Sequence, residues 1–304
     1  MQIGFVGLGK MGGNMVHRIQ RDSEHECVAF DRKAASVEAA ESHGATGVGS
    51  LEDLVGKLEA PRTVWVMVPA GEATESTVLE LADLLDPGDL IVDGGNSNFH
   101  DDIRRGAELA EHGLHYVDVG TSGGVWGLDT GYCMMVGGPR EGVERLGPIL
   151  DVLAPPDGWR HFGSAGAGHY VKMVHNGVEY GLMQAYAEGF ELMHKAPFEI
   201  DLQEVAGLWN RGSVVRSWLC ELAERAFAAE GNDLEAIVGH VSDSGEGRWT
   251  VFDGIDRDVP TPVITAALYA RFYSRGAGDY TNRMLAALRN QFGGHDVERA
   301  AGGG

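Results

Sequence analysis

Short apolar runs alternate with segments of helical periodicity through the first half of the chain. Segments 72–85 and 101–112 have the spacing of amphipathic helices. The apolar runs predict strands at Gln2 to Gly7, Cys27 to Phe30, Val64 to Val68, Leu90 to Asp93, Tyr116 to Val119 and Tyr132 to Gly138. Strands that alternate with helices are typical of a doubly wound parallel sheet. The sequence therefore predicts an N-terminal α/β domain of the Rossmann type.

Beyond Gly163 the pattern becomes helical and contains no convincing strand. The absence of proline from Gly158 through Ala196 predicts one long helix there. Further helices are expected at 199–210, 213–229, 232–240, 262–274 and 279–291. A length of 304 residues suits two domains. We expect a dinucleotide-binding domain over 1–163, an all-helical domain for substrate binding and oligomerisation over 164–295, and a flexible tail over 296–304.

The long helix carries an unusual polar stripe. At about 100° per residue, five polar side chains fall within an arc of roughly 140°. They are Lys172, His175, Asn176, Glu179 and Tyr180. The rest of the segment is apolar or small, so we expect the stripe to line a cavity. Burial disfavours the charged forms of an amine and a carboxyl, which suits Lys172 and Glu179 to act as general base and general acid. The alternative is a structural ion pair.

A glycine-rich turn follows the first predicted strand. Its residues are Gly7, Leu8, Gly9, Lys10, Met11 and Gly12. The motif GxGxxG between a strand and a helix is typical of dinucleotide binding, with the pyrophosphate at the helix N-terminus. Asp31 ends the second strand, where an acidic side chain binds the adenosine ribose and repels a 2′-phosphate. Asp31 favours NAD, whereas Arg32 and Lys33 could bind the 2′-phosphate of NADP. Because Asp31 stands at the position that contacts the ribose, NAD is the expected cofactor and NADP is less favoured.

Later strands also end in candidate binding residues, because ligands bind at the carboxyl ends of parallel strands. Val68, Pro69 and Ala70 are placed beside the cofactor, and Asn96 is placed near the nicotinamide, although its Gly-Gly-Asn-Ser context also fits an ordinary turn. A third loop contains Ser122, Gly123 and Gly124. Its amides and hydroxyl would suit a carboxylate or a similar anion.

Composition excludes several classes of protein. The net charge of -21 repels nucleic acid and anionic membranes. We see no apolar run long enough for a membrane span and no leader peptide, so we expect a cytoplasmic protein. Five of the 24 basic residues are lysines and 19 are arginines, which fits either a high-salt cytoplasm or a genome rich in G and C. The cysteines Cys27, Cys133 and Cys220 have neither disulfide nor zinc spacing, and we expect no metal requirement.

Several motifs together resemble one family closely. They are Asp93 to Ser97, Ser122 to Gly124, Gly166 to Gly177 and Gly247 to Thr250, in that order along the chain. The sequence resembles the decarboxylating 6-phosphogluconate dehydrogenases, in their short, NAD-linked form, over nearly its whole length. It lacks the second helical copy of the longer members and has Gly9, the triplet Asp31 to Lys33 and Pro69 where those members usually differ.

The resemblance implies a role for each matched residue. Lys172 would remove the proton of the C3 hydroxyl, and Glu179 would protonate C1 of the enediol left by CO2 loss. Substrate contacts are implied for Asn96, Ser122, Gly123, Gly124, His175 and Asn176. Phosphate ligands are implied at Tyr180, Arg248, Thr250 and Arg271. Near the C-terminus, Arg289 and His295 would reach the phosphate in a neighbouring subunit, which implies a homo-oligomer, either a dimer or a tetramer.

Two other functions are considered. A β-hydroxyacid dehydrogenase or semialdehyde reductase shares the fold and the helix lysine, but usually carries Asn where His175 stands and lacks the Glu179–Tyr180 pair. A non-catalytic dinucleotide-binding protein would also keep the fold. A protein that only binds a dinucleotide would not need an acid and a base, such as Glu179 and Lys172, on the same side of a cavity.

Overall fold

A computed structural model describes residues 1–293 of the chain, which leaves the predicted tail and His295 outside the described residues. The chain forms two compact units, the first from Met1 to His175 and the second beginning at Asn176. Among the described residues, no helix is both long and apolar enough to cross a membrane. The division of domains expected near residue 163 stays a prediction.

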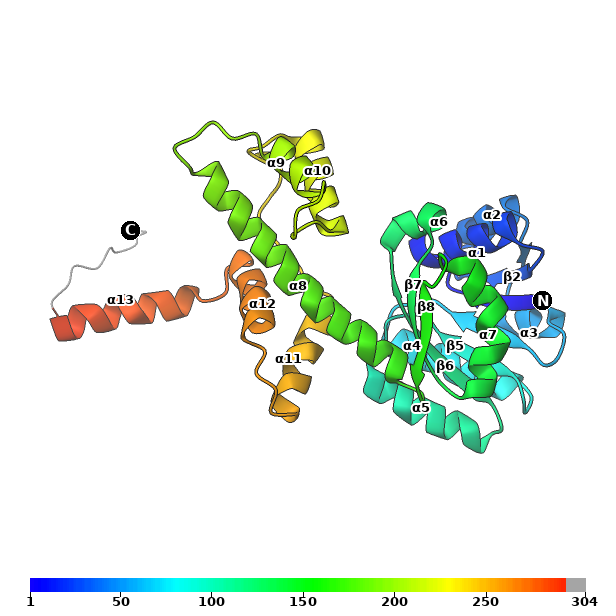
Figure 1. The fold of residues 1–304 in the computed structure, drawn as a ribbon. Coiled ribbons are helices and arrows are strands. Elements are labelled where there is room, and N and C mark those ends of the chain that lie inside the picture. Colours follow the sequence, from blue (N-terminus) through cyan, green and yellow to red (C-terminus); the bar gives the residue numbers. More distant parts are fainter. Residues whose placement is uncertain (294–304) are drawn as a thin grey trace, which may run out of the picture. The chain divides into compact units, whose positions relative to one another are not determined.

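The first unit is built on one eight-stranded sheet with the order β3-β2-β1-β4-β5-β6-β7-β8 (Figure 1). The strands are β1 Gln2–Val6, β2 Glu26–Phe30, β3 Thr46–Gly47, β4 Thr63–Val66, β5 Leu90–Asp93, β6 His115–Ser122, β7 Cys133–Gly137 and β8 Trp159–Gly163. This arrangement confirms the predicted α/β class. One pairing departs from the predicted parallel sheet, because β7 runs antiparallel to β6. The connection over 123–132 is too short for the crossover that parallel pairing needs.

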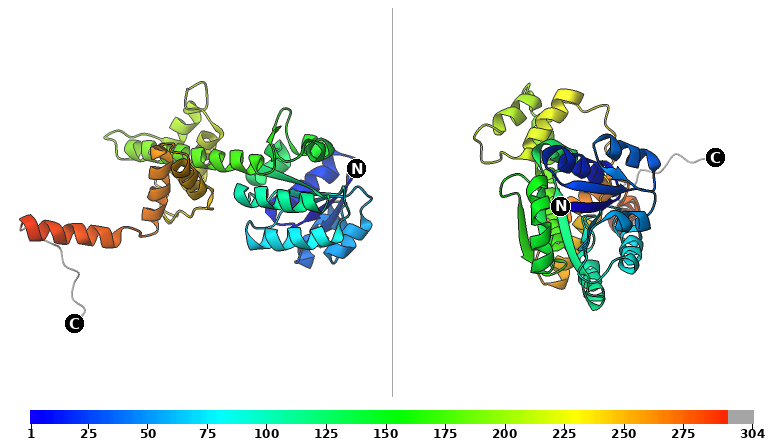
Figure 2. Two further views of the ribbon diagram at one scale, coloured as in Figure 1. Left: turned by 90° about the horizontal axis from the view of Figure 1, so that it is seen from below. Right: turned by 90° about the vertical axis from the view of Figure 1, so that its right-hand side faces the viewer.

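Helices cover both faces of this sheet (Figure 2). The helices of the first unit are α1 Lys10–Asp22, α2 Ala34–Ser42, α3 Leu51–Lys57, α4 Glu72–Leu84, α5 Phe99–Glu111, the 3-10 turn η1 Gly124–Trp126, α6 Gly127–Thr130 and α7 Arg140–Leu153. Apolar residues of α1, α2 and α7 form one core, and those of α3, α4 and α5 form another. Neighbouring strand residues alternate between the cores, as Phe5 and Val6 do.

Two strands of this unit were not predicted. β3 has two residues, which is too short for an alternating pattern. β8 occupies the start of the segment where the long helix was expected, so that helix begins later than predicted. β8 is an edge strand, and its middle residues, from Arg160 to Phe162, are exposed. A strand without a buried face has no alternating apolar pattern by which the sequence could predict it.

The helix α8, Ala167–His194, begins in the first unit and continues into the second, where the remaining elements are all helical. These are α9 Leu202–Trp209, α10 Trp218–Glu230, α11 Glu246–Asp256, α12 Pro262–Ser274 and α13 Asp279–Gly293. Phe190 packs with apolar residues of α9 and α10 in one small core. Tyr180 packs with residues of α11 and α12 in another.

The helix predicted over 232–240 is wrong, because that segment is irregular. The preceding helix ends at Gly231 with φ of 81°, and Leu234 also has a positive φ of 51°. These left-handed conformations end a right-handed helix and prevent a new one from starting. A helix that was not predicted, α11, follows instead and carries Arg248 and Thr250.

Candidate active site

The turn between β1 and α1 has the geometry of a dinucleotide-binding loop. Gly7 has φ of 94°, and a Cβ there would lie 2.5 Å from the carbonyl oxygen of Met67. A Cβ on Gly12 would overlap the carbonyl oxygen of Gly7, so α1 can pack this close only with glycine. Gly9 is the N-cap of α1 and faces open space. The N-terminus of α1 is therefore open to a phosphate group.

A cavity of about 640 Å³ lies beside this turn. Six of the predicted cofactor residues line it, namely Gly7, Gly9, Asp31, Arg32, Val68 and Pro69. The other six, Leu8, Lys10, Met11, Gly12, Ala70 and Asn96, are not among its lining residues. Ser36, Ser50 and Thr77 add hydroxyl groups that the sequence pattern did not indicate. The glycine turn, the open helix end and the acidic residue at the cavity wall fit NAD.

Asp31 also braces the loop itself. Its Oδ2 accepts a hydrogen bond of 2.7 Å from the backbone of Leu8, and its Oδ1 accepts one of 2.8 Å from the backbone of Lys33. Each carboxylate oxygen has a second lone pair, so the ribose hydroxyls still find acceptors. One side chain thus holds the phosphate-binding turn and presents charge to the ribose.

Four of the predicted substrate and catalytic residues gather near the end of β6 in the first unit. Lys172 is 6% exposed, and a Cβ on Gly120 would overlap the Lys172 side chain. Ser122 Oγ lies 3.4 Å from His175 Nε2. Asn96, with φ of 54°, accepts a 3.3 Å hydrogen bond from the backbone of Thr121. The structure brings these side chains together from the loop after β5, from β6 and from α8.

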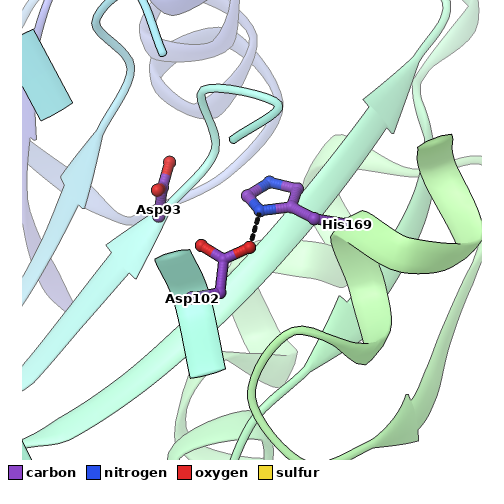
Figure 3. Close-up of side chains that lie close together, drawn as sticks. All are labelled: Asp93, Asp102 and His169. Atoms are coloured by element: carbon purple, nitrogen blue, oxygen red, sulfur yellow. Dashed lines mark hydrogen bonds and ion pairs between the residues drawn. The ribbon is translucent and has the colours of Figure 1, made fainter. Parts of the chain in front are cut away.

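A buried hydrogen-bond network lies beneath this group. Nδ1 of His169 is 2.8 Å from the Asp102 carboxylate (Figure 3). The Tyr116 hydroxyl bonds to Asp102 at 2.8 Å and to Asp93 at 3.0 Å. Arg105 pairs with Asp93 at 3.3 Å. No role was predicted for these residues, although Asp93 ends a strand and His169 lies in a motif shared with the family.

The charge state of this network follows from its neighbours. Burial lowers the pKa of His169, but the charge and hydrogen bond of Asp102 raise it to about 10. Burial raises the pKa of Asp118. Ligand atoms of Asp93, Asp102 and His169 lie within 4.8 Å of one another, the spacing of a metal site. Arg105 and the Tyr116 hydroxyl already engage those carboxylates.

In the second unit, Tyr180 forms the base of an arginine cluster. The guanidinium of Arg271 stacks 3.7 Å from the centre of the Tyr180 ring, and its Nη1 donates to the Ser242 carbonyl at 3.0 Å. The Tyr180 hydroxyl accepts a 3.2 Å hydrogen bond from the backbone of Ser244. A side chain at Gly247 would overlap the same ring. The ring and Arg271 therefore have fixed positions.

Arg248 is fixed in the same cluster by a residue that was not predicted. Its Nε donates to Asp243 at 2.6 Å, and Arg275 bonds to the same carboxylate at 2.7 Å. Hydrogen bonds from Arg248 lower the pKa of Asp243 to about 2. Both guanidiniums also lie near the Phe272 ring, at 4.4 and 5.2 Å from its centre. Asp243 lies in an irregular segment without periodicity, and Arg275 is distant from it in the sequence, so no local pattern indicated either residue.

The remaining predicted residues vary in setting. Asn176 and Glu179 are half-buried on α8. Thr250 is buried, and its hydroxyl donates to the Glu246 carbonyl within α11 at 2.8 Å. Gly123 and Gly124 both have positive φ, which exposes backbone at the end of β6. Arg289 is exposed on α13.

The sequence matches known proteins of one family over most of its length. Residues 2–164 match the NAD binding domain of 6-phosphogluconate dehydrogenase, and residues 168–285 match the 6-phosphogluconate dehydrogenase C-terminal domain. The chain is 47% identical to the NAD(+)-dependent, decarboxylating 6-phosphogluconate dehydrogenase of Haloferax volcanii, over 98% of this chain and 99% of that protein.

Longer relatives match over part of their length. The decarboxylating 6-phosphogluconate dehydrogenase of Lactococcus lactis subsp. lactis is 36% identical, and the match covers 89% of this chain and 61% of that one. Among solved structures, the Plasmodium falciparum 6-phosphogluconate dehydrogenase aligns with a TM-score of 0.83 at 27% identity, over 99% of this chain and 66% of that chain.

The buried ion pair predicts how stability depends on pH. The folded-state pKa of His169, about 10, exceeds its ordinary value of 6.5, so the pair stabilises fully below about pH 6.5 and the gain is lost as pH rises through about 10. We expect the free energy of unfolding of the native protein to fall towards that of His169→Asn by up to about 1.4 kcal/mol per pH unit. Urea unfolding between pH 6.5 and 10 measures this. His112→Gln, at an exposed site, should run parallel to the native protein, and a parallel course for His169→Asn would contradict the assignment.

Proposed function

The chain belongs to the 6-phosphogluconate dehydrogenase family, and on that premise we propose that it converts 6-phosphogluconate to ribulose 5-phosphate and CO2 while reducing NAD. The observation that carries the proposal is the match to an NAD(+)-dependent, decarboxylating relative over nearly the full length of both chains. The site supports it, because Lys172 is buried next to the end of β6, where Ser122 and His175 also lie.

The proposed chemistry uses two groups on α8. Lys172 accepts the proton of the substrate's C3 hydroxyl. NAD, when bound, supplies the acceptor for the hydride from C3. The resulting 3-keto acid breaks its C1–C2 bond, CO2 leaves, and the bonding electrons move to the ketone oxygen to give an enediolate. Lys172, now an ammonium, stabilises that oxygen, and Glu179 protonates the carbon that lost CO2.

Residues that bind the substrate are proposed in each of the two units. Asn96, Ser122, Gly123, Gly124, His175 and Asn176 are proposed to hold the hydroxyls and the carboxylate. Arg248, Arg271, Tyr180 and Thr250 are proposed to hold the phosphate, which the arginine cluster suits because guanidinium groups bind phosphate oxygens in pairs. Leu8 to Gly12, Asp31 and the end of β4 are proposed for NAD, with Asp31 disfavouring NADP. We assign the cofactor to residues 1–163 and the helical substrate and oligomerisation domain to 164–295.

The reaction is tested by initial rates with 6-phosphogluconate and either cofactor. We expect one CO2 for each NADH formed and a higher kcat/KM with NAD than with NADP, because Asp31 repels the 2′-phosphate. Trapped CO2 and absorbance at the NADH band give the two quantities. Oxidation without CO2 would indicate a hydroxyacid dehydrogenase, and binding of NAD with no turnover of any sugar acid would indicate a binding protein.

The two proposed proton-transfer groups are tested by substitution. Lys172→Met and Glu179→Gln should each lower kcat by about 10² to 10⁴-fold, the usual worth of a general base or acid. Lys195→Met and Glu188→Gln are matched controls, since both side chains are exposed at or beyond the C-terminal part of α8. Full activity in Lys172→Met would refute its role as base, and full activity in Glu179→Gln would refute its role as acid.

We further propose a homo-oligomer in which Arg289 and His295 complete the phosphate site of a neighbouring copy. Large apolar side chains exposed on α12 and α13 support an interface there. They are Tyr269, Tyr273, Tyr280, Met284, Leu285 and Leu288, which are 46–74% exposed. Apolar area of this kind usually marks a protein interface.

Subunit mixing tests the shared site. Arg289→Met should raise KM for 6-phosphogluconate about tenfold or more, because one charge-assisted contact to phosphate is lost. Arg283→Met on the same helix, whose guanidinium pairs with Asp279, should not. If copies share sites, mixing inactive Lys172→Met with Arg289→Met restores sites of native affinity, because each pair contains one intact Lys172 facing one intact Arg289. No gain on mixing of exchanged subunits would reject the shared site.

A further inference from the structure

The start of α8 is attached to the sheet by one carboxylate. Asp118, in β6, accepts hydrogen bonds of 2.8 Å from the backbone of Gly166 at Oδ1 and of His169 at Oδ2. These amides belong to the helix N-terminus, where no intrahelical acceptor exists. The carboxylate therefore fixes the position of the first turn.

Close packing leaves this part of the helix no room to shift toward the sheet. A Cβ on Gly168 would lie 2.7 Å from the carbonyl oxygen of Asp118, and a Cβ on Gly120 would overlap Lys172. Backbone therefore meets backbone on this side. A small rotation about the helix axis moves side-chain atoms farther than backbone atoms, because the backbone lies closer to the axis.

The ring of His169 resists rotation because it is held away from the helix axis. It is 1% exposed, and Nδ1 bonds to Asp102 on α5. Among residues 1–293, Nε2 has no hydrogen-bond partner, so the bond to Asp102 determines the orientation of the ring. Asp102 is in turn fixed by Tyr116, which also bonds to Asp93.

The same network reaches the loop that carries Asn96. Asp93 accepts hydrogen bonds from the backbone of Gly95 at 2.8 Å and from the Ser97 hydroxyl at 2.7 Å. The residues on either side of Asn96 are therefore bonded to the carboxylate that shares the Tyr116 hydroxyl with Asp102. A continuous path of hydrogen bonds links the Asn96 loop to His169.

His169 and Lys172 are three residues apart on α8, so their side chains leave the same side of the helix as neighbours. A rotation of about 10° would displace a side-chain atom about 6 Å from the axis by about 1 Å. Misplacement of a catalytic group by that distance costs on the order of 10²-fold in rate. The orientation of His169 thus matters for chemistry at Lys172.

Resting on the proposed function, we propose that His169, held by Asp102, is a positioning residue that sets the rotation of α8 and thereby aims the Lys172 amine at the substrate's C3 hydroxyl. His169 contacts neither substrate nor cofactor in this role. Asp102, Tyr116 and Asp93 extend the support to the Asn96 loop, so the base and the loop keep one relative geometry.

The kinetic test compares two substitutions of the same residue. His169→Leu removes the bond to Asp102, whereas His169→Asn keeps an N–H donor close to the position of Nδ1. We expect His169→Leu to lower kcat about 10 to 100-fold with KM for NAD within about twofold, and to increase the solvent deuterium isotope effect on kcat. His169→Asn should keep kcat within about threefold of native. Equal kcat in native protein and His169→Leu would overturn the proposal, as would an equal loss in both variants.

A second readout does not depend on the substrate. Pulse acetylation followed by peptide mass spectrometry compares Lys172 with Lys10, Lys33, Lys57 and Lys195 in the same molecule. We expect Lys172 to be acetylated at least about threefold faster in His169→Leu, with the other four rates unchanged. If native protein fails to turn over 6-phosphogluconate, the proposed function fails, and this labelling still decides whether His169 positions Lys172.

Controls separate positioning from stability. Asp101→Asn, one residue from Asp102 and half-buried, and His112→Gln, exposed at the end of α5, should match native protein in kcat and labelling. Should His169→Leu fail to fold, Asp102→Leu carries the test, since leucine has nearly the shape of aspartate and cannot accept the hydrogen bond from Nδ1 of His169. It should show the same fall in kcat at constant KM for NAD, and a native kcat in that variant would overturn the proposal.

Discussion

A buried lysine beside β6 requires a helix with a fixed position, and Asp118 provides the first constraint on that helix. Its two oxygens accept from two backbone amides at the start of α8, so the carboxylate serves as a remote cap. Gly120 then allows the helix to approach until Lys172 touches the backbone of β6. Cap and contact act on adjacent turns, and together they fix where the lysine emerges.

The network around Asp118 carries an electrostatic cost that its members share. Asp93, Asp102 and Asp118 are all fully buried, and isolated charges in such a setting would be strongly unfavourable. Arg105, the Tyr116 hydroxyl and backbone amides offset much of that cost, and a charged His169 offsets more. Removing one member would leave another charge uncompensated, so the members of the group depend on one another.

Sequence reasoning succeeded where periodicity or a local motif carried the signal. The glycine turn and six of the strands of the sheet were visible because their geometry is set within a few residues. β8 was not predicted, because an exposed edge strand has no buried face and therefore no alternating pattern. The helix expected at 232–240 does not form, because a residue in a left-handed conformation interrupts it. Asp102 could not be predicted, because its partner His169 is distant in the sequence. Asp243 could not be predicted, because it lies in a loop without periodicity.

The arginine cluster of the second unit shows why the basic residues are mostly arginines at this place. In a chain with a net charge of -21, the phosphate dianion that we propose for this cluster needs a local surplus of positive charge. Arg271 lies over Tyr180, and Arg248 lies over Phe272 while Asp243 orients it. A planar guanidinium can stack on a ring and still direct donors outward, whereas a lysine ammonium, a compact point charge, offers no planar fork for both. Stacking therefore orders these side chains before an anion arrives, which lowers the entropy lost on binding.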